Sequence, residues 1–124
     1  MQWLAVALGG AIGAMARFGV NAVIFPLTEG KFPLGTLVVN VLGSVLMGVV
    51  YVLIVERGLL PPEMRNFLMI GCLGAFTTFS TFSLDALALW QNGHHLLGFA
   101  YVLGSVILCL AGALAAIYIA RYLL

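Results

Sequence analysis

The sequence has very little charge. Only 7% of its 124 residues are Asp, Glu, Lys or Arg, whereas 64% are hydrophobic, and the mean hydropathy is +1.19. Soluble domains carry about 25% charged residues, and a chain of this length cannot bury so much apolar surface in one core. The composition therefore excludes a soluble domain and predicts that lipid surrounds most of the chain.

Cysteine is also scarce, and the motifs of most soluble functions are missing. The two cysteines, Cys72 and Cys109, fall inside apolar runs, so the disulfide framework of a secreted protein is not expected. We find no phosphate-binding glycine loop, no His/Cys cluster at metal spacing and no nucleophilic triad. A formal charge of +1 offers no basic face to nucleic acid. These absences argue against an enzyme and against a nucleic-acid-binding protein.

Apolar residues form four long runs. A membrane-spanning helix needs about 20 mostly apolar residues, and such runs cover residues 1–26, 34–55, 66–84 and 96–120. The first run lacks the basic start of a signal peptide, so we interpret it as a retained helix. We predict an all-α membrane protein with one four-helix transmembrane domain over residues 1–124. Its helices are expected at about 2–26, 33–56, 62–91 and 95–123.

The basic residues are nearly balanced between the two ends of these helices. Four spans place both termini and the second loop on one side, with Arg57, Arg65 and Arg121. The other side receives Lys31, and also Arg17 if it lies toward that helix end. Orientation follows the asymmetry of Lys and Arg, and three against two is a small bias. The chain could insert in both orientations or modestly prefer one.

Small residues in the first run suggest close helix packing. Gly9 and Gly13 form a small-xxx-small pair, which lets helices approach closely in lipid. Four short helices can scarcely enclose a pore by themselves, so we expect a multimer. The glycine pair could serve that contact or pack within one subunit.

Polar side chains recur at four-residue spacing, on one helix face, in three of the runs. The three files are Thr36, Asn40 and Ser44; Thr77, Thr81 and Asp85; and Tyr101, Ser105 and Cys109. A single Ser or Thr usually bonds its own i−4 carbonyl, but the amide of Asn40 requires a partner or a ligand. Phenylalanines at every third position, Phe76, Phe79 and Phe82, interleave with the hydroxyls. The pattern favours a polar pathway over simple packing.

The chemistry of this pathway favours a small anion. No acidic residue is central to a span, whereas a cation path is usually lined by carboxylates or carbonyls. Amide N–H groups, hydroxyls and the positive edges of aromatic rings can all donate toward an anion.

The stretch GCLGAFTTFSTFS, residues 71–83, contains signals for a broken helix. Gly71 and Gly74 are followed by Thr77 and Thr78. A break at membrane depth frees backbone groups, which protein or a bound ion must satisfy. Freed carbonyls could hold a small cation, or the segment could be an intact helix packed tightly on its neighbours.

Over essentially its whole length, the chain resembles the Fluc fluoride channels, also called camphor-resistance proteins. The resemblance rests on GCLGAFTTFSTFS at 71–83, GTLVVNVLGS at 35–44 and GGAIGAMARF at 9–18. It implies a dual-topology antiparallel homodimer in the cell (inner) membrane, with the third helix broken in mid-membrane. The implied function is passive efflux of fluoride from the cytoplasm, which reduces fluoride toxicity.

The same resemblance implies the site residues. A structural Na⁺ would bind between the subunits through the backbone carbonyls of Gly74 and Thr77. The implied fluoride pathway comprises Arg17, Asn40, Phe79, Ser80, Thr81, Phe82, Tyr101 and Ser105. Cys109 and Asp85 depart from the commonest pattern, in which a hydroxyl and a glutamate are often found.

Two other functions are weighed against this one. A small multidrug transporter is also a four-helix dual-topology dimer, but it relies on a glutamate in its first helix, where this chain has only Arg17. A non-transporting assembly subunit would not need three polar files. Flux measurements separate the three functions.

Overall fold

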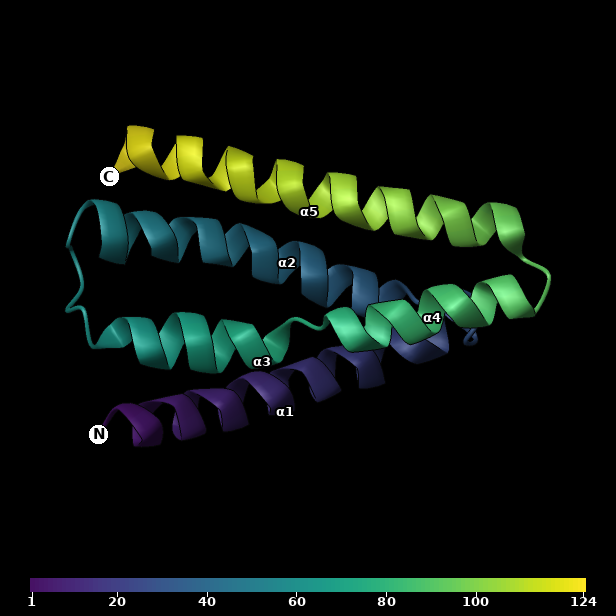
Figure 1. The fold of residues 1–124 in the computed structure, drawn as a ribbon, viewed down its shortest axis with the longest axis horizontal. Helices are drawn as coiled ribbons and strands as arrows, with labels where there is room; N and C mark the ends of the chain where they lie inside the picture. The colour runs from purple at the N-terminus through teal and green to yellow at the C-terminus, as the bar shows by residue number, and fades with distance from the viewer.

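Four long apolar helices make up the chain (Figure 1). The structure, a computed structural model, describes all residues from Met1 to Leu124. In chain order the elements are α1 (Gln2–Thr28), α2 (Leu34–Tyr51), η1 (Val52–Glu56), η2 (Asn66–Leu73), α3 (Gly74–Phe76), α4 (Phe79–Gln91) and α5 (His95–Leu123). The π-helical η1 continues α2, and η2, α3 and α4 together form the third long helix. All four are long and apolar enough to cross a membrane, so the predicted all-helical, four-span architecture is confirmed.

The third helix is broken between α3 and α4. Thr77 and Thr78 have extended backbones, with φ −82° and ψ 160° at Thr77 and φ −154° and ψ 121° at Thr78. Figure 1 shows the resulting extended link, which lies roughly midway along this helix. The predicted break is confirmed, and the alternative of an intact helix in residues 71–83 is wrong.

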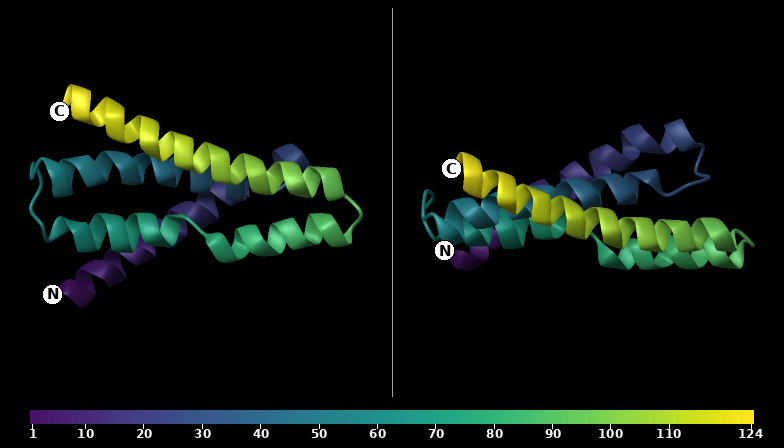
Figure 2. Two further views of the ribbon diagram at one scale, coloured as in Figure 1. Left: turned by 45° about the horizontal axis from the view of Figure 1, so that its top comes forward. Right: turned by 90° about the horizontal axis from the view of Figure 1, so that it is seen from above.

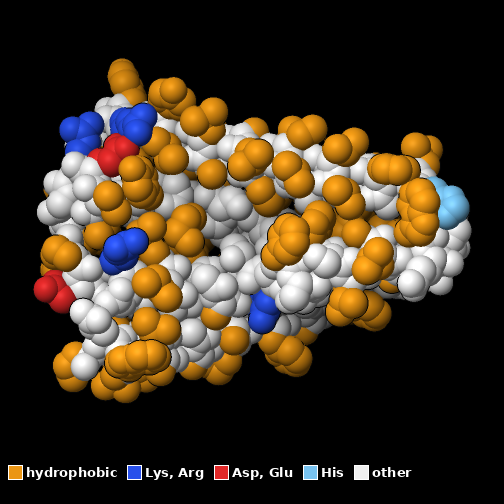
Figure 3. Space-filling model, in the orientation of Figure 1, with side chains coloured by type: hydrophobic (Ala, Val, Ile, Leu, Met, Phe, Trp, Pro, Cys, Tyr) orange, Lys and Arg blue, Asp and Glu red, His pale blue; other side chains and the backbone are white.

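Both chain termini lie at one end of the molecule, together with the loop of residues 57–65 (Figure 1). Most acidic and basic side chains on the face drawn in Figure 3 gather at this end. Arg121, near the end of α5, forms a two-pronged ion pair with Glu56, with Nε 2.8 Å from Oε2. Arg57 donates to the backbone carbonyl of Arg121 at 2.8 Å. These contacts fasten the end of α5 to η1.

Glycines bring α1 against η2 within one chain. A Cβ added to Gly9 would lie 3.0 Å from the backbone nitrogen of Cys72, and one added to Gly71 would lie 2.9 Å from the Cα of Gly9. A Cβ on Gly13 would likewise overlap the carbonyl of Cys72. The Gly9–Gly13 pair therefore serves packing within the subunit. Figure 2 shows that α1 crosses the other helices at an angle, so its two ends lie beside different elements.

Much of the apolar surface of the chain is uncovered. Only 20 of the 124 residues are buried, and large apolar side chains such as Trp3, Leu96 and Leu110 are largely exposed. Such a surface suits contact with lipid or with another membrane-embedded chain, because neither offers polar partners. The largest fully buried side chains are Tyr101, Val39 and Val52.

Candidate functional site

Asn40 joins α2 to the break in the third helix. Its Nδ2 donates to the carbonyl of Thr78 at 2.9 Å, and the Thr78 N–H donates to its Oδ1 at 2.8 Å. Both backbone groups of an extended residue are thus satisfied at membrane depth, where water cannot replace them. The expectation that Asn40 needs a partner outside its own helix is met by main chain 38 residues away. One N–H of the amide is not used in this pair of bonds.

Thr78 is also the N-cap residue of α4. Its Oγ1 accepts from the Thr81 N–H at 3.2 Å, which is the usual bond of a helix N-cap. The same oxygen lies 3.2 Å from the Thr81 hydroxyl and 3.3 Å from that of Ser80. Thr78 was absent from the predicted site. The preference of Thr for N-cap positions could have identified it, but only with the break placed at this residue.

The bonds made by Asn40 and Thr78 release two carbonyls of the third helix. In an uninterrupted helix the Thr78 N–H would donate to Gly74 and the Thr81 N–H to Thr77. Here those N–H groups donate to Asn40 and to the Thr78 side chain. The Thr77 hydroxyl donates to the Leu73 carbonyl at 3.0 Å and so does not bond to either released carbonyl. Gly74 and Thr77 therefore offer main-chain oxygens. Nowhere in the chain do three or more His, Cys, Asp or Glu side chains gather where they could hold a metal ion.

A cavity of about 370 Å³, the central pocket, lies beside the break. It is lined by Asn40, Gly43, Ser44, Met47, Thr77, Thr78, Phe79, Phe82, Ser105, Val106, Cys109 and Leu110. Four of the predicted pathway residues thus meet here: Asn40, Phe79, Phe82 and Ser105. Ser105 is 4% exposed, and its Oγ has no hydrogen-bond partner. The face drawn in Figure 3 is hollowed in its middle, in the region where Figure 1 shows the break.

Three aromatic rings pack in a row beside the central pocket. Phe82 is buried between Phe79 and Tyr101, with ring centroids 5.4 Å and 5.2 Å apart. Phe79 is 78% exposed, so its ring lies on the outside of a single chain. The hydroxyl of Tyr101 donates to Asp85 Oδ2 at 3.3 Å.

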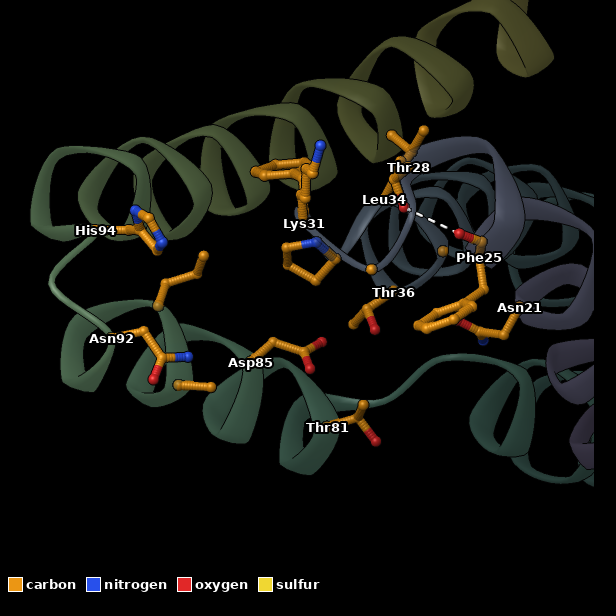
Figure 4. A pocket seen from close by; sticks show the side chains of 16 residues that line it. Asn21, Phe25, Thr28, Lys31, Leu34, Thr36, Thr81, Asp85, Asn92 and His94 are labelled. Atoms are coloured by element: carbon orange, nitrogen blue, oxygen red, sulfur yellow. Dashed lines mark hydrogen bonds between the residues drawn. The ribbon is translucent and has the colours of Figure 1, made fainter.

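A second cavity of about 360 Å³, the mouth pocket, lies toward the end opposite the termini. Figure 4 shows Thr36 and Asp85 projecting toward one another from α2 and α4, with Lys31 and His94 on the surrounding loops. Thr81 lines this pocket and not the central one. The buried Tyr101 lies between residues of the two pockets: its ring contacts Phe82 of the central pocket, and its hydroxyl donates to Asp85 of the mouth pocket.

Three predicted pathway residues, Arg17, Ser80 and Tyr101, line neither pocket. Arg17 is half-buried on α1, and its side chain makes no hydrogen bond or ion pair. Its backbone carbonyl accepts from Asn21 Nδ2 at 3.0 Å. Ser80 is exposed beside the break. Thr36 and Asp85, which line the mouth pocket, were outside the predicted site although both belong to the polar files.

Comparison with known proteins identifies the family. A family model described as "CrcB-like protein, Camphor Resistance (CrcB)" matches residues 4–117. The chain belongs to the CrcB/FluC family. The Fluoride-specific ion channel FluC of Saccharophagus degradans is 54% identical over 121 residues, which cover 98% of this chain and 90% of that relative. The protein of the same name from Hahella chejuensis is 50% identical over 119 residues, or 96% of this chain and 94% of that relative.

Membership of the CrcB/FluC family confirms the resemblance carried by the three motifs. The family is one of ion channels and not of enzymes. With its four candidate spans, this member of the CrcB/FluC family is a multi-pass membrane protein.

Proposed function

We propose that the chain is a fluoride-selective channel that lets fluoride leave the cytoplasm passively. The observation that carries this proposal is the 54% and 50% identity, over nearly the whole chain, to relatives named as fluoride-specific channels. Fluoride enters a cell as the weak acid HF and is released as an anion in a more alkaline cytoplasm. A passive path for that anion needs no nucleotide site, and the sequence has no phosphate-binding loop.

The fluoride pathway runs through the central pocket toward the mouth pocket. The Ser105 hydroxyl has no hydrogen-bond partner in the chain. Asn40 has a second amide N–H, which is not used in its bonds to Thr78 and can donate to an anion. The edges of Phe79 and Phe82 carry partial positive charge. Close donors of this kind replace the hydration shell of a small anion and fit a larger one poorly.

The remaining pathway residues connect the pocket with water. Tyr101 links the central pocket to the mouth pocket, where Thr81 places a hydroxyl. Ser80 lies beside the same break. Arg17 has no acidic partner, so its charge raises the local concentration of anions.

The working channel is an antiparallel homodimer. In a single chain Gly74, Phe79, Ser80 and Thr81 are exposed at the level of the break, midway along the span. Free carbonyls and hydroxyls at this depth require protein cover. A second copy supplies that cover, and the near balance of basic residues allows the two copies to insert in opposite orientations.

The carbonyls of Gly74 and Thr77 would hold a structural Na⁺ between the two copies. Hard cations take oxygen ligands, and two copies together present four such oxygens without a carboxylate. A Cβ on Gly74 would meet only the Met69 carbonyl, at 3.4 Å, so this face of the break is open in one chain. When bound, the ion would supply positive charge that offsets the carbonyl dipoles at the interface.

Reconstitution into liposomes tests the function directly. We expect purified protein to release trapped fluoride, measured with a fluoride electrode, and to retain chloride, measured with a chloride electrode. Liposomes without protein give the background leak. Comparable chloride release would contradict the proposed selectivity.

A further inference from the structure

Two residues with sulfur in their side chains line the central pocket. Met47 comes from α2 and Cys109 from α5, and both line this cavity. The two helices pack along one another, as Figure 1 also shows. One helical turn before Cys109, Ser105 brings its buried hydroxyl, which has no partner in the chain. The pocket thus combines two soft donors with a polar group whose bonding capacity is unmet.

The chemistry of the lining selects a particular class of ligand. Thiolate and thioether donors favour soft metal ions such as Cu(I). No carboxylate or imidazole lines the central pocket, so it offers hard cations no charged ligand. Met47 has a flexible thioether side chain that can adjust to a nearby ion.

We propose that Met47 and Cys109 form a site for a soft monovalent metal cation, Cu(I) or its analogue Ag(I), inside the central pocket. On binding, the S–H bond of Cys109 breaks, its proton goes to water, and a sulfur–metal bond forms without a change of oxidation state. Asn40, Phe79 and Phe82 line the same cavity. An occupied site therefore obstructs the fluoride pathway, a consequence that rests on the proposed function.

The chain contains its own control for this site. Its only other cysteine, Cys72, belongs to η2, lies against Gly13 of α1 and is outside the central pocket. Purified protein is incubated with silver nitrate, then with N-ethylmaleimide, and the labelled peptides are quantified by mass spectrometry. We expect Ag(I) to protect Cys109 at concentrations that leave Cys72 reactive. Met47→Leu should raise the concentration for half-protection of Cys109 about tenfold or more. Equal protection of both cysteines, or an unchanged value in Met47→Leu, would overturn the site.

Flux measurements test the obstruction separately. Silver fluoride is soluble, so Ag(I) can be added during fluoride release from liposomes, with each variant compared to its own untreated rate. We expect Ag(I) to stop release by wild-type protein and by Cys72→Ser, and to have no effect on Cys109→Ser or Cys109→Ala. Equal block of the Cys109 variants would overturn the obstruction. If untreated protein releases no fluoride, the proposed function fails, whereas the labelling experiment still decides the metal site.

Discussion

Among single residues, Asn40 has two structural roles in the site. Its two bonds satisfy both backbone groups of Thr78, and its side chain also lines the central pocket. The same amide therefore fixes the geometry of the break and faces the cavity that we propose as the fluoride pathway. We expect a substitution at this position to lower both stability and fluoride release, and the two effects can be measured separately.

Asn40→Leu should remove both bonds at once. Leaving the Thr78 N–H and carbonyl unsatisfied costs about 1–3 kcal/mol for each group, so the midpoint of thermal unfolding should fall. Fluoride release should drop at least tenfold, because a donor in the pathway is lost as well. Asn40→Asp is the comparison: it keeps an acceptor for the Thr78 N–H but turns an oxygen toward the Thr78 carbonyl, and it should also conduct poorly. Near-normal release by both variants would exclude Asn40 from the pathway.

The phenylalanines of the third helix should differ in their effects on fluoride release. Phe79 and Phe82 line the central pocket, whereas Phe76 is 7% exposed and lies outside it. Replacement by Ile keeps most of the bulk and removes the positive ring edge. We expect Phe79→Ile and Phe82→Ile to lower release strongly, with Phe76→Ile as the milder control for core packing. Size-exclusion profiles should show that all three remain folded. Equal, small effects at the three rings would mean that the stripe serves packing alone.

Among the elements, α2 stabilises the break in the third helix, because its residues contact the extended link at Thr77 and Thr78. Gly43 of α2 faces the methyl group of Thr77, and a Cβ at Gly43 would overlap that methyl and lie 3.3 Å from the Phe76 ring. The extended link thus has room only because α2 carries a glycine here. Asn40, one turn earlier on the same helix, then reaches the Thr78 backbone.

Gly43→Ala should displace the link between α3 and α4. The added methyl pushes Thr77 away from α2, so the Asn40–Thr78 bonds weaken and both fluoride release and thermal stability fall. Gly19→Ala is the matched control, because a Cβ at Gly19 on α1 meets nothing within 4 Å. The control should keep its release rate. Unchanged release and stability in Gly43→Ala would show that the break does not depend on this contact.

For the whole molecule, the distribution of basic residues decides how the chain enters the membrane. Both termini and the loop of residues 57–65 share one end (Figure 1). Arg57, Arg65 and Arg121 belong to that end, and Lys31 lies in the turn at the other. A bias this small is easily tipped by a few added charges.

Two added lysines in the loop of residues 57–65 should hold that loop in the cytoplasm. If antiparallel pairs are required, this variant alone should lose most fluoride release, because every copy then has one orientation. Coexpression with a variant biased in the opposite sense should restore it. Orientation is checked by protease access to tags placed in the loops. Full release from a population shown to have one orientation would contradict the antiparallel dimer.

The sequence alone determined the four spans and the approximate place of the break. Apolar runs are visible in the sequence of a helical membrane protein, since each helix that spans the lipid needs about 20 mostly apolar residues. The Gly/Thr stretch signalled an interruption within residues 71–83, because few other patterns weaken a helix at membrane depth. The requirement of Asn40 for a partner also followed from its chemistry.

Only the tertiary structure decided which groups satisfy one another. It placed Asn40 on the Thr78 backbone, 38 residues away, assigned the Gly9–Gly13 pair to contact with η2, and divided the polar files between two pockets. The four-residue spacing of polar residues in the sequence indicates which side chains share a helix face. Which face meets which neighbour depends on the crossing of α1 and on the room left by Gly43, and these arise from packing between segments distant in the chain.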